Sequence, residues 1–127
     1  MSTTLEELHV RTVQRYGWVP DVPDHRDLLF SAPGAVVGNL PSSVDLRPHC
    51  PAVYQQGELG SCTANAIAAA FEFDQLTQGL AEFTRSRLFI YNERTIEGTV
   101  RSDSGAMLRD GMKAVNQLGV CPETEWP

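Results

Sequence analysis

The chain has 127 residues, a formal net charge of −6, 42% hydrophobic residues and 20% charged residues. Its length fits one domain or part of one, and its composition fits an ordinary water-soluble globular protein. The excess of acidic residues argues against nucleic acid or an anionic membrane surface as the main partner.

The N-terminal stretch predicts a short helix and shows no sign of export. Thr3 and Thr4 each precede a glutamate by three residues, a capping-box spacing that starts a helix near Leu5, and this helix should stop before Gly17. The stretch has neither the basic nor the apolar region of a signal peptide, and no apolar run in the chain approaches the roughly 18 to 20 residues of a membrane span. A cytoplasmic location without membrane contact is therefore expected.

Residues 17–52 are expected to be extended and irregular. They contain six prolines and three glycines, and each proline fixes φ, removes a hydrogen-bond donor and restricts its predecessor. The stretch also carries large apolar side chains, at Trp18, Leu28, Leu29, Phe30, Val44 and Leu46. Because so many apolar groups do not suit a solvated linker, the segment is predicted to lie as a belt against a larger body.

Three helices are predicted after the belt, over residues 61–77, 86–97 and 104–118. The first is apolar nearly all round, which predicts burial on most of its sides. The third contains Gly111, which costs a helix about 1 kcal/mol and so indicates close packing at that point. No period-2 pattern predicts a strand, so the fold class is mainly α.

Local signals mark the ends of these helices. Ser86 is the expected N-cap of the second helix, and Asp103 or Ser104 that of the third. Glycine is the common residue just past a helix, and it is expected to end the three helices at Gly79, Gly98 and Gly119.

The three cysteines, Cys50, Cys62 and Cys121, are an odd number at irregular spacing, which fits neither a disulfide framework nor a CxxC metal site. At least one thiol should be free, and a Cys50–Cys121 bridge remains open. His49 adjoins Cys50, but no second pair of ligands follows at a suitable spacing. No metal and no cofactor are expected.

Cys62 stands at the predicted start of the first helix, where a nucleophilic thiolate would be favoured. A helix N-terminus has unpaired N–H groups and about half a positive charge, and both stabilise a thiolate. The Cys62 N–H could also point at a developing oxyanion, and Gln56, six residues upstream across Gly57 and Gly60, could supply a second donor. The alternative is a structural Cys62, since free cysteines are often small buried hydrophobic residues.

The stretch VDLRPHCPAVYQQGELGSCTANAIAAAFEFD, residues 44–74, resembles the start of the mature domain of papain-like cysteine peptidases. That family has a Val-Asp-Trp-Arg stretch and then a Gln-Gly-x-Cys-Gly-Ser-Cys-Trp motif that leads into a central helix. Residues 44–47 match the opening, and Gln56-Gly57 and Gly60-Ser61-Cys62 match the motif in order and spacing.

The resemblance implies a role for each matching position. It makes Cys62 the nucleophile and Gln56 the oxyanion donor, and it places Gly60 and Ser61 at the substrate cleft. Downstream, Ser104-Gly105 corresponds to a glycine pair that lines the cleft and bonds the substrate backbone, and only Gly105 is an exact match.

The resemblance also implies a fold. Residues 41–127 would form the helical left lobe of the papain-like α+β fold, an incomplete peptidase domain without its β-rich lobe. Residues 1–40 would be an N-terminal helix and an extended Pro/Gly-rich segment. Leu59 replaces a disulfide-forming cysteine, Thr63 replaces an aromatic residue, and no long inhibitory propeptide precedes residue 40; the pattern is most similar to the bacterial, leaderless branch of the family.

A catalytic histidine is not found where the family has it. The histidines of the chain, His9, His25 and His49, all precede Cys62, whereas papain-like enzymes place theirs far downstream of the cysteine. The chain is therefore interpreted as the nucleophile half of a cysteine peptidase, inactive alone, that acts on a peptide or protein substrate. Its expected partner is the β-rich lobe, in cis or in trans, or a second copy. The alternatives are a non-catalytic protein-binding module and an unrelated helical protein.

Overall fold

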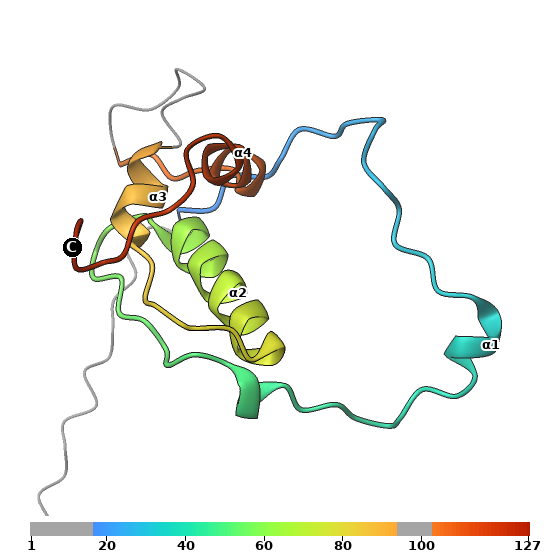
Figure 1. The fold of residues 1–127 in the computed structure, drawn as a ribbon. Helices are drawn as coiled ribbons and strands as arrows, with labels where there is room; N and C mark the ends of the chain where they lie inside the picture. The colour runs from blue at the N-terminus through green and yellow to red at the C-terminus, as the bar shows by residue number, and fades with distance from the viewer. Residues whose placement is uncertain (1–16, 94–102) are drawn as a thin grey trace, which may run out of the picture.

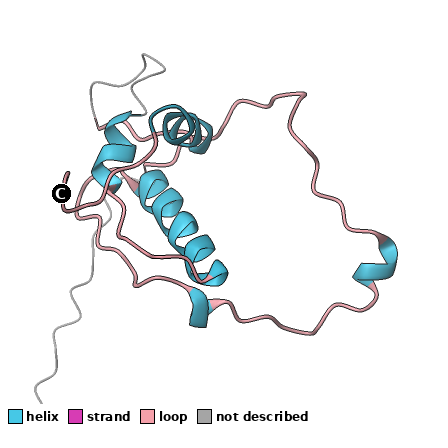
Figure 2. Cartoon of the chain, viewed as in Figure 1, coloured by secondary structure: helices cyan, strands magenta, loops and turns pink. Residues whose placement is uncertain are grey.

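The computed structural model describes residues 17–93 and 103–127 of the chain (Figure 1). The elements are α1 (Gly34–Val37), the 3₁₀-helix η1 (Arg47–His49), α2 (Cys62–Gln78), α3 (Arg87–Glu93) and α4 (Leu108–Leu118). Over the described ranges there are helices and two isolated bridges but no strand (Figure 2), which confirms the mainly α prediction. The predicted helix near Leu5 lies outside the described residues.

The body of the molecule is formed by α2, α3 and α4, which pack against one another (Figure 1). Its core consists of apolar residues that are almost inaccessible to solvent: Ala64, Ile67 and Ala68 of α2 and Ile90 and Tyr91 of α3. Val115 of α4 packs on this cluster from the third side. None of the helices in the described part of the chain is both long and apolar enough to cross a bilayer.

The bounds of α2 agree with the predicted helix 61–77 to within one residue. Gly79 ends it in the left-handed conformation, with φ of 65°, as glycine does at this position. The prediction of burial on most sides agrees with the described residues, except along one stripe where Ala66 and Ala70 are exposed. One face of α2 is thus uncovered.

The second predicted helix begins as expected. The Ser86 hydroxyl accepts a hydrogen bond of 3.0 Å from the Phe89 N–H, so Ser86 is an N-cap, and α3 starts at the next residue. Residues 94–97 of this prediction, and Gly98 after them, lie outside the described residues.

The start of the third predicted helix is wrong by four residues, since α4 begins at Leu108 and not at Ser104. Asp103 does not cap it, because its carboxylate accepts hydrogen bonds from Gly60 and Tyr91 instead. Ala106 pairs its backbone with another segment of chain, which keeps the stretch before α4 extended.

Further along α4, two glycines behave as predicted. A Cβ on Gly111 would lie 2.5 Å from Ile67 Cδ1 of α2, so the two helices approach closely there, and Gly119 ends α4 with φ of 76°.

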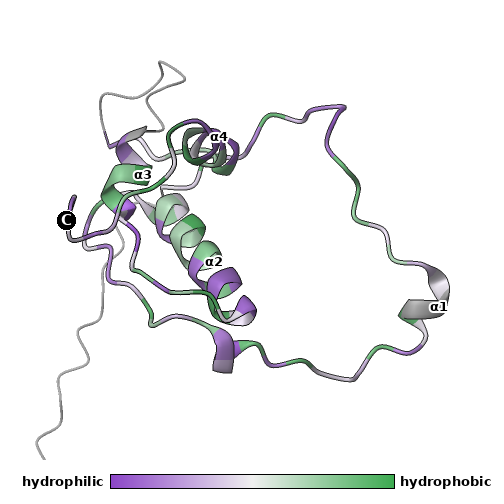
Figure 3. Ribbon diagram, viewed as in Figure 1, coloured by the Kyte–Doolittle hydropathy of each residue, from purple (hydrophilic) through white to green (hydrophobic). Residues whose placement is uncertain are grey.

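The predicted belt splits into two parts. Residues 17–27 contact the helical body, whereas residues 28–46 leave it and return in a wide loop that carries α1 (Figure 1). Hydrophobic positions recur along this loop (Figure 3), and Leu28, Leu29 and Phe30 are 92–99% exposed. For these side chains the prediction of packing is wrong, because the loop of residues 28–46 runs away from the helical body and carries them into solvent.

Candidate active site

Cys62 is the first residue of α2 and is half-buried. The N–H groups of the first helical turn have no partner inside the helix, and they carry the positive end of its dipole. The Ser61 side chain makes no capping hydrogen bond to them; its hydroxyl accepts from Asn65 Nδ2 at 3.1 Å. The Ser61 hydroxyl therefore does not cap the helix end at which Cys62 stands.

The turn before Cys62 is held by its own polar groups. Gln56 Nε2 donates to the Leu59 carbonyl oxygen at 2.8 Å, and Gly57 takes a positive φ of 63°. The glycine thus makes the sharp turn that the sequence indicated. The role of Gln56 as an oxyanion donor stays a prediction.

Asp103 links this turn to the segment before α4. The Gly60 N–H donates to both carboxylate oxygens, at 3.0 and 3.1 Å, and the Tyr91 hydroxyl donates to Oδ1. Sequence reasoning placed Asp103 at a helix cap and so missed this contact. The sequence feature that could have pointed to this contact is the position of Asp103 immediately before the Ser104-Gly105 pair.

Ser104 and Gly105 lie beside the N-terminal segment of the chain. Ser104 is half-buried, and Gly105 is buried with φ of 84°. The next residue, Ala106, donates its N–H to the Gly17 carbonyl at 2.7 Å and accepts from the Val19 N–H at 2.9 Å. The backbone edge next to Gly105 is thus paired with residues 17–19.

Three glycines allow these segments to meet. A Cβ on Gly17 would lie 1.7 Å from the Gly60 carbonyl oxygen, and one on Gly105 would lie 2.2 Å from the Gly17 carbonyl oxygen. The Cys62 turn, the Gly105 segment and the N-terminal segment therefore converge on one point at which no side chain fits.

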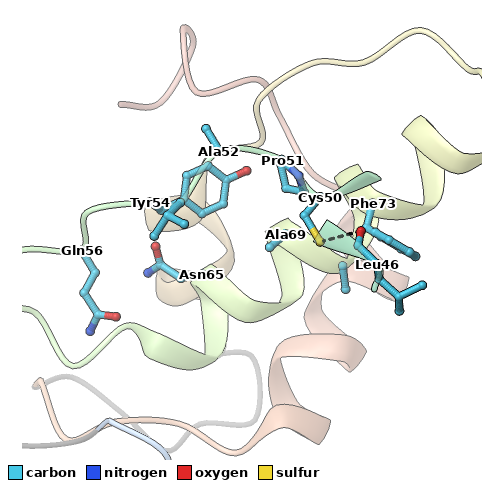
Figure 4. Close-up of a pocket in the computed structure, with 11 residues that line it drawn as sticks. Leu46, Cys50, Pro51, Ala52, Tyr54, Gln56, Asn65, Ala69 and Phe73 are labelled. Carbon is cyan, nitrogen blue, oxygen red and sulfur yellow. Dashed lines mark hydrogen bonds between the residues drawn. The ribbon is translucent and has the colours of Figure 1, made fainter. Parts of the chain in front are cut away.

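An apolar groove of about 490 Å³ runs along the uncovered face of α2. Residues 50–54 form one wall, and Asn65, Ala69, Ala70 and Phe73 of α2 form the other. In Figure 4 Gln56 lies at one end of the groove, and Leu46, Cys50 and Phe73 lie at the other. The groove thus begins next to the turn that precedes Cys62.

Polar groups stand beneath one wall of this groove. The Arg87 guanidinium lies 4.5 Å from the centre of the Tyr54 ring and pairs with Glu123 near the C-terminus. Burial raises the pKa of the Tyr54 phenol, and the negative charge of Glu72, which is 1% exposed, raises it further. Tyr54 therefore remains neutral at physiological pH.

Among the described residues, the other cysteines and histidines do not form a cluster with Cys62. All three cysteines are free thiols, so the Cys50–Cys121 bridge is not formed. His25 and His49 are exposed, and His9 lies outside the described residues. Within residues 17–93 and 103–127 no three His, Cys, Asp or Glu side chains are grouped as metal ligands would be.

Comparisons with known proteins bear on what this arrangement does. The crystal structure of xylellain, a cysteine protease from Xylella fastidiosa, matches with a TM-score of 0.77 and 54% sequence identity, over 88% of this chain and 42% of that one. The chain is homologous to papain-like cysteine peptidases. An uncharacterised peptidase C1-like protein of Acanthamoeba polyphaga mimivirus is 39% identical over 134 residues, which cover 91% of this chain and 43% of that protein. No family model matches the chain.

These relatives confirm two predictions from the sequence. The resemblance to cysteine peptidases inferred from residues 44–74 is confirmed, and the helical body corresponds in fold to part of a solved cysteine protease. The chain spans less than half the length of both relatives. The roles of Cys62, Gln56, Gly60, Ser61, Ser104 and Gly105, and the division of the chain at residue 40, remain predictions.

Proposed function

We propose that this chain provides the nucleophile half of a papain-like cysteine peptidase that hydrolyses bonds in peptide or protein substrates. One observation carries the proposal: Cys62 is the first residue of α2, in a chain that is 54% identical to a cysteine protease over 88% of its length. A cysteine at the mouth of a helix has the electrostatic setting that favours the reactive thiolate.

In the proposed reaction the Cys62 thiolate attacks the carbonyl carbon of the scissile peptide bond. The Cys62 N–H and the Gln56 amide hold the resulting oxyanion. Gln56 Nε2 carries two hydrogens, so its bond to the Leu59 carbonyl leaves the second one for this task. Gly60, Ser61, Ser104 and Gly105 line the cleft on either side of the substrate.

In this proposal the general base lies outside residues 1–127. The sequence contains no histidine after Cys62, and the relatives are more than twice as long as the matched region. The imidazole that protonates the leaving amine would belong to a β-rich lobe, in the same polypeptide or bound to it. No cofactor takes part.

The apolar groove along α2 is the proposed surface for that lobe. It is large, lined mostly by apolar residues and adjacent to the turn that precedes Cys62, and exposed apolar surfaces of this kind mark interaction sites. More than half of each relative lies outside the region that matches this chain, and this supports the β-rich lobe as the occupant of the groove. A second copy of the chain would use the same face to form a dimer.

The thiol is tested in a chain that carries Cys50→Ser and Cys121→Ser, so that Cys62 is the one cysteine left. Iodoacetamide at pH 7 should alkylate Cys62 about tenfold faster in the folded chain than in 6 M guanidinium chloride, because only the folded chain has the helix end. Equal rates in the two states would overturn the proposal and favour a structural Cys62 in an unrelated helical protein.

Turnover is tested separately with a fluorogenic peptide. The 127-residue chain should hydrolyse it no faster than a Cys62→Ser variant, since the thiolate lacks its imidazolium partner. Hydrolysis above that background would show that the base lies within this chain. A chain that is strictly monomeric in sedimentation and binds no apolar dye would count against the docking face.

A further inference from the structure

Two parts of the proposed cleft that are far apart in sequence are joined by one carboxylate. Gly60 precedes the nucleophile by two residues, and Asp103 precedes Gly105 by two residues. The Gly60 N–H points between the two oxygens of Asp103, at 3.0 and 3.1 Å, across a separation of 43 residues. Hydrogen bonds from a backbone N–H to an ionised carboxylate are stronger than neutral ones.

The Asp103 carboxylate is itself held in place by a residue of the core, Tyr91. Tyr91 lies in α3 with its side chain 3% exposed, among the buried residues of α2 and α3. Its hydroxyl donates to Asp103 Oδ1, the same oxygen that accepts from Gly60. A rigid aromatic side chain thus fixes the position of the group that binds the turn.

The fit around Gly60 is tight. A Cβ on Gly60 would lie 2.9 Å from Asp103 Oδ1 and 3.4 Å from the Gly17 Cα. The close approach of the carboxylate therefore depends on glycine at this position, and the turn has little room to shift towards Asp103.

We infer that Asp103 is a positioning residue for Cys62: with Tyr91 it holds Gly60, and so fixes the entry of the chain into α2 that presents the thiol at the end of the helix. The inference rests on the proposed role of Cys62 as the nucleophile. A displacement of about 1 Å at a reacting group can reduce rate as much as a hundredfold. The effect comes from the hydrogen bonds of the carboxylate and not from its charge.

Two substitutions separate these possibilities. Asp103→Asn keeps one oxygen that can accept from both Gly60 and Tyr91, removes the charge, and replaces Oδ2, the second and longer acceptor of the Gly60 N–H, with an amide nitrogen. Asp103→Ala removes the acceptor altogether. If position matters, the Asn variant retains the reactivity of Cys62 and the Ala variant loses it; if charge matters, the two variants behave alike.

The experiment uses the chain with Cys50→Ser and Cys121→Ser and measures the rate of Cys62 alkylation by iodoacetamide at pH 7. Asp103→Asn should react within about twofold of this parent, and Asp103→Ala at least fivefold more slowly, with faster hydrogen exchange at the Gly60 N–H. Asp74→Ala, which removes an exposed carboxylate near the other end of α2, is the control and should leave the rate unchanged.

Each outcome decides the inference. An Asp103→Ala variant that reacts like the parent overturns it, and so does an Asn variant that is as slow as the Ala variant. If Asp103→Ala does not fold, Tyr91→Phe decides, because it keeps the core ring and removes the hydroxyl: a two- to threefold slower reaction supports the inference, and an unchanged rate overturns it. A parent that reacts no faster folded than unfolded refutes the proposed function instead.

Discussion

Replacing Gly17 with alanine should force apart the three backbone segments that meet beside Cys62. The added Cβ would lie 1.7 Å from the Gly60 carbonyl oxygen and 2.3 Å from its carbon. Both atoms belong to the backbone, so no change of side-chain rotamer can relieve the overlap. The backbone itself must therefore move to relieve the overlap.

The size of the effect follows from the contacts that must open. Ordinary contact begins at 3.4 Å, so the segments must separate by about 1.7 Å. That movement breaks the hydrogen bond from the Ala106 N–H to the Gly17 carbonyl, at 2.7 Å, and the one from the Val19 N–H to the Ala106 carbonyl, at 2.9 Å. At about 0.5–1.5 kcal/mol for each bond, the free energy of unfolding should fall by about 1–3 kcal/mol.

Urea unfolding followed by circular dichroism measures this change, and hydrogen exchange locates it at the Ala106 and Val19 amides. Gly34→Ala is the matched control, because nothing lies within 4 Å of its added Cβ, and it should change the stability by less than about 0.5 kcal/mol. The reasoning is refuted if Gly17→Ala is as stable as the control and both amides stay protected.

Two other predictions concern the core and the groove wall. Ile67→Val removes the Cδ1 atom that a Cβ on Gly111 would approach to 2.5 Å, so the double variant with Gly111→Ala should be about 1 kcal/mol more stable than the sum of the single variants; additive values from urea unfolding would contradict this. The raised pKa of Tyr54 keeps its phenol protonated in the folded chain where the unfolded chain, with a tyrosine pKa near 10, releases the proton. The contribution of Tyr54 to stability is thus fully present below pH 10 and is lost as the pH rises above it. Tyr54→Phe should remove this part of the decline, and an identical decline in the two proteins between pH 9 and 11.5 would contradict the assignment.

Local chemistry made much of the helical body predictable. The end of α2 at Gly79, the cap of α3 at Ser86 and the end of α4 at Gly119 each depend on residues within one turn of the helix end. Signals of this range can be read from the sequence, since glycine and serine act on the backbone beside them. The same holds for the turn at Gly57 and for the place of Cys62 at the start of a helix.

Contacts between distant segments were not predictable in this way. Asp103 has the local pattern of a helix cap, yet its carboxylate accepts from Gly60, 43 residues away, and α4 begins at Leu108. The pairing of Gly17 with Ala106 likewise joins two segments with no shared sequence signal. Local helix propensity is overridden where hydrogen bonds to distant segments satisfy the polar groups that would otherwise start or cap the helix.

Burial was the other property that the sequence could not supply. An apolar residue indicates a preference for the interior, but whether a surface is available depends on the packing of the other elements. Ala66 and Ala70 of α2 and Phe30 of the extended segment are exposed in the described chain. In both places the prediction of burial would need a further surface beyond the three helices.

The wide loop of residues 28–46 has a consequence for how the chain tolerates change in length. One end is tethered by the Asp27–Arg109 ion pair, and the other is fixed by η1 beside α2. Doubling the length of a flexible loop between fixed ends costs only about 0.6 kcal/mol in closure entropy. Insertions, or a cut in the peptide backbone, near α1 would leave every contact between α2, α3 and α4 in place. Residues 17–27 could thus dock on the helical body as part of a separate polypeptide.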